Sequence, residues 1–346
     1  MKQTMLKAQS KVNLQFSIYN LKHNVMNNLI VNDTDGADGM KEIIDSFLSI
    51  IPGSQNSQAV PVLEANVLEE SVFKNEWVSK NRACLIKGAV KHWPAVEKWR
   101  NKEYWLGACE NFEINVYPHQ NFVDGSRQEE GHQTMSYHDA IERLHENRDY
   151  VFSIPSAKIR EGGRFGKIKN DIGGFEFLQS AEMPRFYDRM RFFTYRRAAT
   201  NWHYHGVDET LMCQVNGAKR VLLLSPKIPR PGYVTKFLLK ESYLDGQKLD
   251  ASLDLKPLVT TVEEGDALYI PPYWHHAVIP EDGEIGFTVA FCWRSPIHKL
   301  GNFSDFFVRD VYKQGLKPFS LRALFLPLFG CYAGMSYGIK KLSGQM

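Results

Sequence analysis

Residues 265–276 read GDALYIPPYWHH, and this stretch decides the fold. A Gly–Asp turn opens it, and residues 267–270 have the length and apolar composition of a buried strand. Two prolines then end the strand, because proline cannot donate a hydrogen bond to a neighbouring strand. The chain re-enters a sheet at His275 or His276. The pattern therefore predicts two short strands joined by a tight turn, with histidine at the start of the second.

Similar segments lie on both sides of this stretch. Short β-rich runs bounded by turn residues span 191–197, 209–215, 219–225, 259–262, 267–270, 275–279 and 286–293. Strands of this length and spacing are typical of a double-sheet β-sandwich or a small barrel. The alternation of strands and helices that marks a parallel α/β sheet is missing, so we expect a mainly β fold.

The chain divides into three parts by its residue composition and its pattern of apolar residues. Residues 1–57 are polar, and we expect a partly helical or poorly ordered arm with one helix at 40–51. Residues 58–300 form the main domain, and 301–346 form a C-terminal helical segment. Its apolar part, 321–339, is marginal in length for a membrane span and contains charge and proline. We therefore expect a packed helix pair or a dimer contact there, and no membrane contact.

The composition limits the class of protein. Hydrophobic residues make up 43% and charged residues 23% of the 346 residues, as in ordinary soluble globular proteins. The net charge of +3 is too small to favour a polyanion, so we expect no nucleic-acid partner. Five scattered cysteines without a C-x-x-C pair indicate reduced thiols. Residues 1–16 contain no continuous apolar run, which argues against a secretory signal, and we expect a cytoplasmic protein.

A second segment, TNWHYHGVDE at 200–209, carries two more histidines. Residues two apart on a strand point to the same face, so His203 and His205 can reach one ion together. A third ligand can come from a neighbouring strand, at His275 or His276. Imidazole suits iron, copper, nickel and zinc. The two segments together predict a site for one divalent metal ion.

From about residue 61 to residue 293 the chain resembles the Jumonji-C (JmjC) or cupin-8 group of iron(II)- and 2-oxoglutarate-dependent oxygenases. The family pattern is Thr-x-x-His-x-Asp, then Gly-x-Lys, then Gly-Asp, Ile-Pro and Trp-x-His. The positions that match it in register are Thr200, His203, Gly217, Lys219, Gly265, Asp266, Pro271, Trp274 and His276. The stretch ACLIKGAVKHWPAVEKW at 83–99 is similar to the family's opening segment. The resemblance implies an α+β but mainly β fold, with a double-stranded β-helix (jelly roll or cupin) core and flanking N- and C-terminal helices.

The resemblance also implies a ligand set and an activity. His276 lies where the family has its last metal ligand, so the metal ligands would be His203, His205 and His276, holding iron(II). The implied reaction is the oxidation of 2-oxoglutarate to succinate coupled to hydroxylation of a carbon–hydrogen bond. The implied substrate is a protein side chain or a small molecule.

Three residues are implied to bind the cosubstrate. By position, Lys219 would pair with the far carboxylate of 2-oxoglutarate, and Thr200 would donate a hydrogen bond to the same group. A tyrosine on an earlier strand often joins them in the family, and Tyr150 is the candidate here.

Two departures from the family put the activity in question. The middle ligand is usually Asp or Glu, but here it is His205, which makes the ligand set one unit more positive. Ala290 stands where the family often has Asn. Two alternatives therefore stay open: a three-histidine cupin dioxygenase that does not use 2-oxoglutarate, and a catalytically inactive cupin-like module that binds a metal or a partner.

Further alternatives concern nearby groups. The spacing His203-x-His205-x-x-x-Glu209 is close to the general cupin motif, in which Glu209 would be a fourth ligand, and Asp208 is another carboxylate within reach. The basic loop 155–174 is a candidate contact for an anionic partner. Related enzymes often form homodimers through C-terminal helices, which the apolar C-terminal segment of this chain would also permit.

Overall fold

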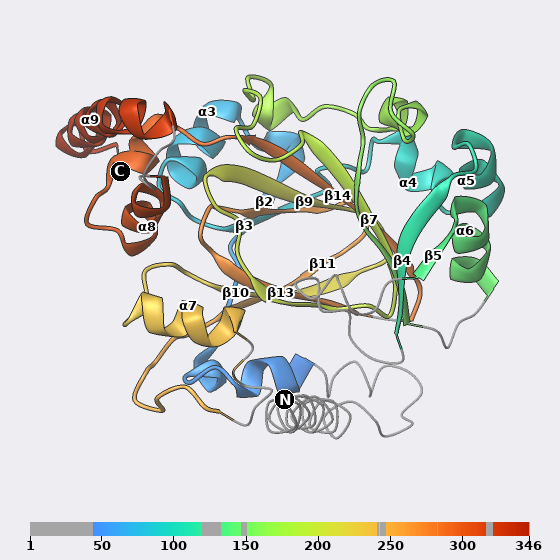
Figure 1. Cartoon of the computed structure of the whole chain (residues 1–346), viewed down its shortest axis with the longest axis horizontal. Coiled ribbons are helices and arrows are strands. Elements are labelled where there is room, and N and C mark those ends of the chain that lie inside the picture. Colours follow the sequence, from blue (N-terminus) through green and yellow to red (C-terminus); the bar gives the residue numbers. More distant parts are fainter. Residues whose placement is uncertain are drawn as a thin grey trace, which may run out of the picture.

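Two β-sheets pack face to face in the computed structural model (Figure 1). The residues that it describes are 44–119, 133–146, 151–240, 242, 247–281, 283–315 and 321–345. Within them, the larger sheet has the order β2-β3-β12-β9-β14-β7-β6-β4-β5, and the smaller has the order β1-β11-β10-β13-β8. Neighbours in each sheet are mostly distant in sequence and antiparallel. This arrangement is the jelly roll that the cupin resemblance predicts.

The strand bounds agree with the predicted β-rich runs. The larger sheet contains β2 (Val62–Glu64), β3 (Cys84–Lys87), β4 (Glu113–His119), β5 (Gln133–Ser136), β6 (Val151–Lys158), β7 (Met190–Arg196), β9 (Asp208–Asn216), β12 (Ala267–Ile270) and β14 (Ile285–Arg294). The smaller contains β1 (Gln58–Ala59), β8 (Thr200–His203), β10 (Lys219–Leu224), β11 (Leu258–Val262) and β13 (His275–Pro280). All seven strands predicted between residues 191 and 293 are confirmed.

Helices cover the outer faces and ends of the sheets (Figure 1). Short helical turns are η1 (Ser54–Asn56), η2 (Ala65–Val67), η4 (Lys167–Asp171), η5 (Glu176–Leu178) and η7 (Ile297–Gly301). Longer helical elements are α3 (Glu70–Val72) with the π-helix η3 (Phe73–Val78), α4 (Pro94–Lys98), α5 (Lys102–Ala108), α6 (Tyr137–Glu146), α7 (Pro231–Leu239), α8 (Phe306–Gly315) and α9 (Leu321–Leu342). Among the described helices, none is both long and apolar enough to cross a membrane.

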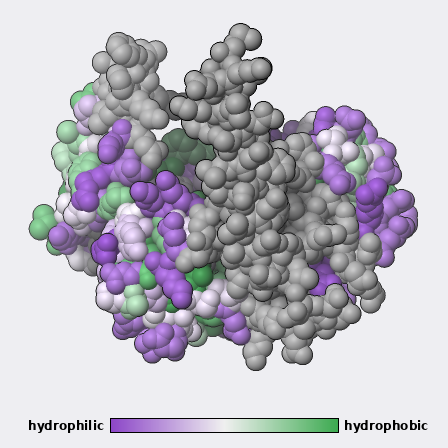
Figure 2. All heavy atoms as spheres, turned by 60° about the horizontal axis from the view of Figure 1, so that its bottom comes forward, coloured by the Kyte–Doolittle hydropathy of each residue, from purple (hydrophilic) through white to green (hydrophobic). Residues whose placement is uncertain are grey.

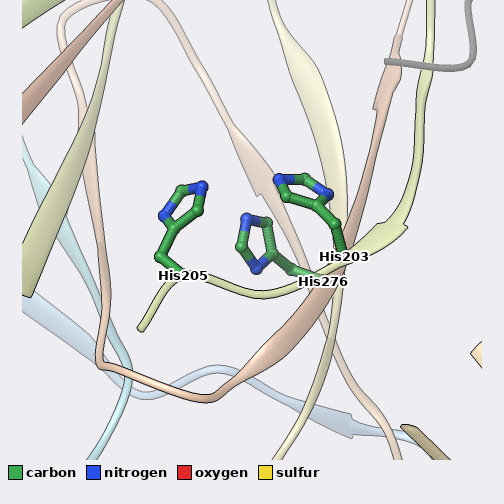
Figure 3. A group of neighbouring side chains, drawn as sticks. All are labelled: His203, His205 and His276. Atoms are coloured by element: carbon green, nitrogen blue, oxygen red, sulfur yellow. The ribbon is translucent and has the colours of Figure 1, made fainter. Parts of the chain in front are cut away.

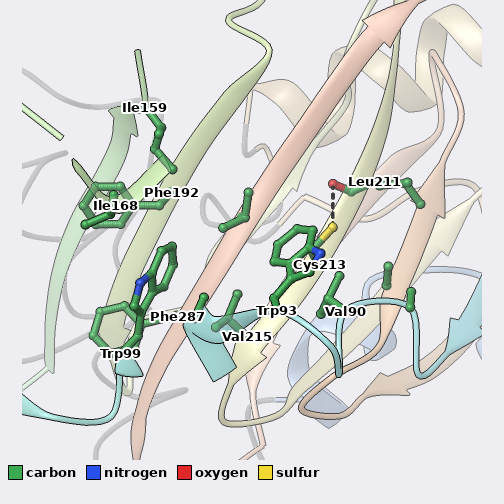
Figure 4. Packing of buried hydrophobic residues seen from close by; sticks show 14 of the residues in the cluster. Val90, Trp93, Trp99, Ile159, Ile168, Phe192, Leu211, Cys213, Val215 and Phe287 are labelled. Carbon is green, nitrogen blue, oxygen red and sulfur yellow. Dashed lines mark hydrogen bonds between the residues drawn. The ribbon is translucent and has the colours of Figure 1, made fainter. Parts of the chain in front are cut away.

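Successive side chains on each strand of the larger sheet point alternately to its outer face and to the interior. On β9, Leu211, Cys213 and Val215 join an outer cluster of large aromatic residues from the flanking helices (Figure 4). Trp105 stacks on Phe287 in that cluster, with ring centroids 4.8 Å apart. Each such buried side chain stabilises the fold by about 1.5–3 kcal/mol. The alternate residues of β9 face the smaller sheet, and they line the interior of the jelly roll.

The outer face of the smaller sheet is covered by α7 and by residues near the start of the described chain. Residues 44–49 are helical, and Phe47 and Ile51 are buried against side chains of β10 and β13. Residues before 44 lie outside the described part. The division into an arm, a main domain and a C-terminal segment stays a prediction.

The C-terminal helices pack at one end of the sandwich (Figure 1). A Cβ atom at Gly301 would lie 2.0 Å from the carbonyl oxygen of Ala333, so glycine lets α9 approach η7 closely. On the described part of the face in Figure 2, hydrophilic and hydrophobic residues are interspersed over small areas. Such a mixed surface is normal for a globular protein.

Candidate metal centre

The first feature of the site is a bulge where β8 pairs with β13. His276 lies opposite His203, but Val278 lies opposite Thr200, so two steps on β13 match three on β8. The extra residue places Thr200 on the same face as His203, which strict alternation would not do. The bulge explains how the Thr-x-x-His spacing can serve one site.

His205 lies beyond the end of β8, in the turn that leads to β9. The sequence predicts that His205 lies beside His203 because both residues would be on one strand. That reason is wrong, because the strand ends at His203. The turn is held instead by the backbone N–H of Tyr273, which donates to the His205 carbonyl oxygen at 2.7 Å. Val207 and Tyr273 both have positive φ, 38° and 68°, so the two turns are tightly wound.

The three predicted histidines converge in the folded chain (Figure 3). One ring nitrogen from each of His203, His205 and His276 lies within 4.8 Å of the other two. The ring centroid of His276 is 4.0 Å from that of His203 and 4.8 Å from that of His205. Among the described residues, this group contains no carboxylate.

Hydrogen bonds orient two of the rings. His203 Nδ1 is 2.8 Å from the Asn201 carbonyl oxygen, and His276 Nδ1 is 2.9 Å from the Trp274 carbonyl oxygen. A carbonyl oxygen can only accept, so each Nδ1 must carry the hydrogen and donate it. Nε2 then keeps its lone pair. Metal-binding histidines usually have this arrangement.

The electrostatic environment suits metal binding. Burial lowers the pKa of His203, and burial together with the neighbouring histidines lowers the pKa of His205 and His276 well below the ordinary value. The rings are therefore neutral near pH 7, which is the form that binds metal ions. Three neutral imidazoles, two of them with Nε2 free, fit iron(II) and other first-row divalent metals.

Glu209 lies on the opposite face of β9 from the histidines. Its fully buried carboxylate accepts hydrogen bonds from Tyr269 Oη, Ser295 Oγ and Lys299 Nζ, each at 2.6 Å. This placement contradicts the alternative in which Glu209 is a fourth metal ligand, because the odd-numbered residues of β9 point away from the interior.

Asp208 is also engaged elsewhere. Its buried carboxylate accepts backbone N–H groups from Arg185, Phe186 and Tyr187, at 2.9, 2.8 and 3.3 Å. The alternative in which Asp208 binds the metal is contradicted as well, because its carboxylate is directed at these N–H groups and is not part of the converging ligand group. Its position shows that the carboxylate fixes the loop that precedes β7.

Lys219 lies inside the sandwich and is only 7% exposed. Its ammonium group is 3.8 Å from the ring centroid of Tyr195 on β7, and burial lowers its pKa to about 7. No carboxylate in the described part of the chain forms an ion pair with it. Thr200 faces the same interior, because its register partner Val278 belongs to the buried cluster between the sheets.

Tyr195 is the residue of this region that the sequence did not single out. It points inward because β7 alternates, and its hydroxyl accepts a hydrogen bond from Gln214 Nε2 at 2.8 Å. The predicted partner of Lys219, Tyr150, lies outside the described residues. Ala290 pairs with Arg191 and Met212 in the larger sheet, and it leaves a small apolar side chain at that point of the interior.

The predicted basic loop begins within β6, which extends to Lys158, and its charged groups have partners within the chain. Lys158 and Arg160 both form ion pairs with Asp188, and Lys169 pairs with Glu161. Exposed pairs of this kind contribute little stability. They do, however, neutralise much of the positive charge that made the loop a candidate for an anionic partner.

Comparisons with known proteins agree with this fold. The cupin-like domain family matches residues 69–299. Jumonji C domain-containing protein 5 of Drosophila melanogaster is 25% identical over 275 residues, 75% of this chain and 66% of that protein. Human tRNA wybutosine-synthesizing protein 5 is 30% identical over 266 residues, 67% of this chain and 78% of that protein. Human bifunctional peptidase and (3S)-lysyl hydroxylase JMJD7 is 23% identical over 291 residues, 71% of this chain and 90% of that protein.

The region matched by the family runs from the start of α3 into η7 and contains every residue of the candidate site described above. Members of the JmjC family use iron(II) and 2-oxoglutarate. The chain belongs to this cupin-like, JmjC family of oxygenases.

Proposed function

We propose that this chain is an iron(II)- and 2-oxoglutarate-dependent hydroxylase, with His203, His205 and His276 as the metal ligands. The observation that carries the proposal is the convergence of three neutral imidazoles at one end of a jelly roll whose interior holds a buried lysine. A lysine buried without a carboxylate partner needs an anion to compensate its charge. The far carboxylate of 2-oxoglutarate would be that anion.

The chain's own residues would bind and orient the cosubstrate. The Lys219 ammonium would pair with the far carboxylate, and the Thr200 hydroxyl would donate to the same group. The Tyr195 ring would lie beside the lysine as a wall of the pocket. Iron(II), when bound, supplies the oxygen chemistry of the reaction, and the protein supplies position and a dry interior. No general acid or base from the protein is required.

The interior between the sheets is apolar around these groups. Met212 of the larger sheet packs with Val221, Leu223 and Val278 of the smaller sheet in one buried cluster. Apolar walls exclude water, and ion pairs strengthen where water is excluded. The Lys219–carboxylate pair would therefore be stronger here than at the surface.

The direct test is succinate formation from 2-oxoglutarate by the chain supplied with iron(II) and oxygen. Because 2-oxoglutarate can be consumed slowly without a prime substrate, the assay is run alone and with panels of peptides and small molecules. The proposal predicts iron-dependent succinate that is lost in His203→Ala and reduced at least tenfold in Lys219→Ala. Absence of succinate from folded, iron-loaded chain across the panels would overturn it.

A second candidate is a three-histidine dioxygenase that does not use 2-oxoglutarate. The carboxylate-free ligand group favours it, whereas the position of Lys219 and Thr200 favours the first candidate. Oxygen consumption that needs iron but not 2-oxoglutarate would support the second. Metal binding without oxygen consumption under either condition would support an inactive module.

His205→Asp separates the cases further. Increased turnover would indicate a weakened oxygenase. Lost turnover would indicate that the reaction depends on the three-histidine ligand set.

We propose a protein side chain as the substrate, with a small molecule as the alternative. Met183 and Phe186 are 60% and 65% exposed on the loop that Asp208 fixes. The Tyr187 ring of the same loop lies 5.7 Å from the His205 ring. Large apolar side chains on a fixed loop beside a metal centre are suited to binding a polypeptide. The printed names of relatives include a lysyl hydroxylase and a tRNA wybutosine-synthesizing protein, so tRNA belongs in the substrate panel.

We also infer that a second copy of the chain binds along α9. Six apolar side chains between 60% and 90% exposed recur on this helix at alternating steps of three and four residues: Phe325, Leu328, Tyr332, Met335, Ile339 and Leu342. This spacing is the a/d seam of a coiled coil, which is self-complementary in a symmetric dimer. A homodimer would cover it.

A further inference from the structure

The three histidines differ in what contacts the nitrogen that faces away from the metal position. In His203 and His276, a backbone carbonyl accepts from Nδ1. In His205, the neighbour of Nδ1 is the hydroxyl of Thr210, at 3.4 Å. A hydroxyl can donate or accept, so Thr210 alone does not decide which nitrogen of His205 carries the hydrogen.

Thr210 has a fixed place in the larger sheet. It is 1% exposed on the interior face of β9, and its register partners are Ile270 on β12 and Cys292 on β14. Because Thr210 and Cys292 are directly opposite on antiparallel strands, their side chains share a face. The Thr210 Oγ1 atom lies 3.7 Å from the Cys292 sulfur.

The contact at the far end of this chain favours one direction for the hydrogen bonds. Arg191 Nη2 donates to the Cys292 sulfur at 3.8 Å, and a guanidinium can only donate. The sulfur accepts in that contact, and its remaining lone pair can also accept from the Thr210 hydroxyl. The lone pairs of the hydroxyl then remain for His205 Nδ1–H. In this direction His205 has the same tautomer as the other two histidines.

We propose that Thr210 is a positioning residue for His205, and that Cys292 acts through Thr210. The inference rests on the proposed metal centre. His205 needs such a partner because it lies in a turn after β8, where no strand pairing orients it. The contact does for His205 what a backbone carbonyl does for each of the other ligands. It directs Nε2 toward the shared position and keeps its lone pair available to the metal.

The test is the affinity of the full-length chain for cobalt(II), which binds imidazole sites and reports their geometry through its visible absorption. Thr210→Val keeps the shape of the side chain and removes the hydroxyl. We expect the cobalt dissociation constant to rise about 10–100-fold, as when the outer partner of a metal-binding histidine is lost. We also expect the visible bands to shift, and Thr210→Ser, which keeps the hydroxyl, to restore affinity and spectrum.

The chain offers matched controls. Thr194→Val makes the same change at a fully buried threonine of β7, whose hydroxyl has no partner among the described residues. Cys292→Ala should weaken cobalt binding less than Thr210→Val, because Thr210 then loses only its acceptor. Cys213→Ala is its control, since Cys213 is equally buried but lies on the outer face of β9. Both controls should bind cobalt as the unaltered chain does.

Three results would overturn the proposal. The first is unaltered cobalt affinity and spectrum in Thr210→Val. The second is equal weakening in Thr210→Val and Thr194→Val, which would indicate a general loss of stability. If Thr210→Val does not fold, Thr210→Ala and Thr210→Ser are compared, and equal affinities in these two would be the third. Failure of the unaltered chain to bind cobalt would instead overturn the metal centre itself, and with it the proposed function.

Discussion

Lys219 is the residue whose chemistry depends most on the interior of the fold. Burial lowers its pKa to about 7, whereas an exposed lysine has a pKa of about 10.4. The charged form is the one that binds a carboxylate. Affinity for 2-oxoglutarate should therefore be highest below pH 7 and fall as the pH rises above it, approaching tenfold per pH unit. The measurement is the apparent KM for 2-oxoglutarate between pH 6 and pH 9.

Lys219→Arg separates this titration from other effects of pH, because a guanidinium stays protonated throughout that range. The variant should have a flatter profile, even if its affinity is lower overall. Identical profiles for the two proteins would mean that Lys219 does not carry the pH dependence.

His275 is adjacent to the proposed ligand His276, but its effect is on the stability of the fold. It is fully buried against Tyr204 and Phe307, and neither ring nitrogen has a hydrogen-bond partner among the described residues. Burying an unsatisfied polar group costs about 1–3 kcal/mol. We therefore expect His275→Leu to increase the free energy of unfolding by about 1–2 kcal/mol, measured by urea denaturation at pH 7.

The same substitution has a pH signature. Burial lowers the pKa of His275 to about 4, below the value of about 6.5 expected in the unfolded chain. Between these values the unfolded chain binds a proton that the folded chain does not, so His275 costs stability as the pH falls from 6.5 toward 4. The advantage of His275→Leu should grow between pH 7 and pH 5. A constant or shrinking advantage would contradict the assignment.

At the scale of elements, the antiparallel pairing of β7 with β14 places Gly286 opposite Tyr195, the residue beside Lys219. A Cβ atom at Gly286 would lie 1.9 Å from Cζ of Tyr195, so the ring could not keep its place beside Lys219. We expect Gly286→Ala to destabilise the fold by about 1–3 kcal/mol and to weaken 2-oxoglutarate binding. Gly283→Ala is the control, because nothing lies within 4 Å of a Cβ there. Equal stability and affinity in the two variants would show that Tyr195 has no such constraint.

The strands themselves could be predicted from the sequence because each is short, apolar and bounded by turn residues. The faces of β8 and β9 could not be predicted in the same way. A bulge in β8 is invisible in a list of residue types, yet it decides that Thr200 and His203 share a face. The face of Glu209 depends on where β9 begins, and a shift of one residue turns a ligand candidate into a buried ion-pair partner of Lys299.

At the scale of the whole molecule, the exposed seam of α9 predicts a dimer. The chain of 39.8 kDa should sediment at twice that mass at micromolar concentration. Met335→Glu places a charge in the seam and should give a monomer, whereas Lys341→Glu, on the same helix but outside the seam, should not. A monomeric unaltered chain at all concentrations would contradict the inference.

The site as a whole could be predicted only in part. His203 and His276 follow from a motif that spans more than seventy residues, and the sheet register brings them opposite each other. His205 reaches the same point through a turn, and Tyr195 is one tyrosine among 15 without a motif around it. Such residues become visible only when the strands are placed in space, because long-range pairing decides which side chains meet.

The central claim is that three particular histidines hold one metal ion. The adjacent residues His275 and His276 provide the sharpest comparison, because only His276 is a proposed ligand. The measurement is the amount of iron(II) bound per chain after anaerobic loading, for the unaltered chain, His276→Ala and His275→Leu. The account predicts one iron per chain for the unaltered chain and for His275→Leu, and none for His276→Ala. Retention of iron by His276→Ala, or its loss from His275→Leu, would contradict the account.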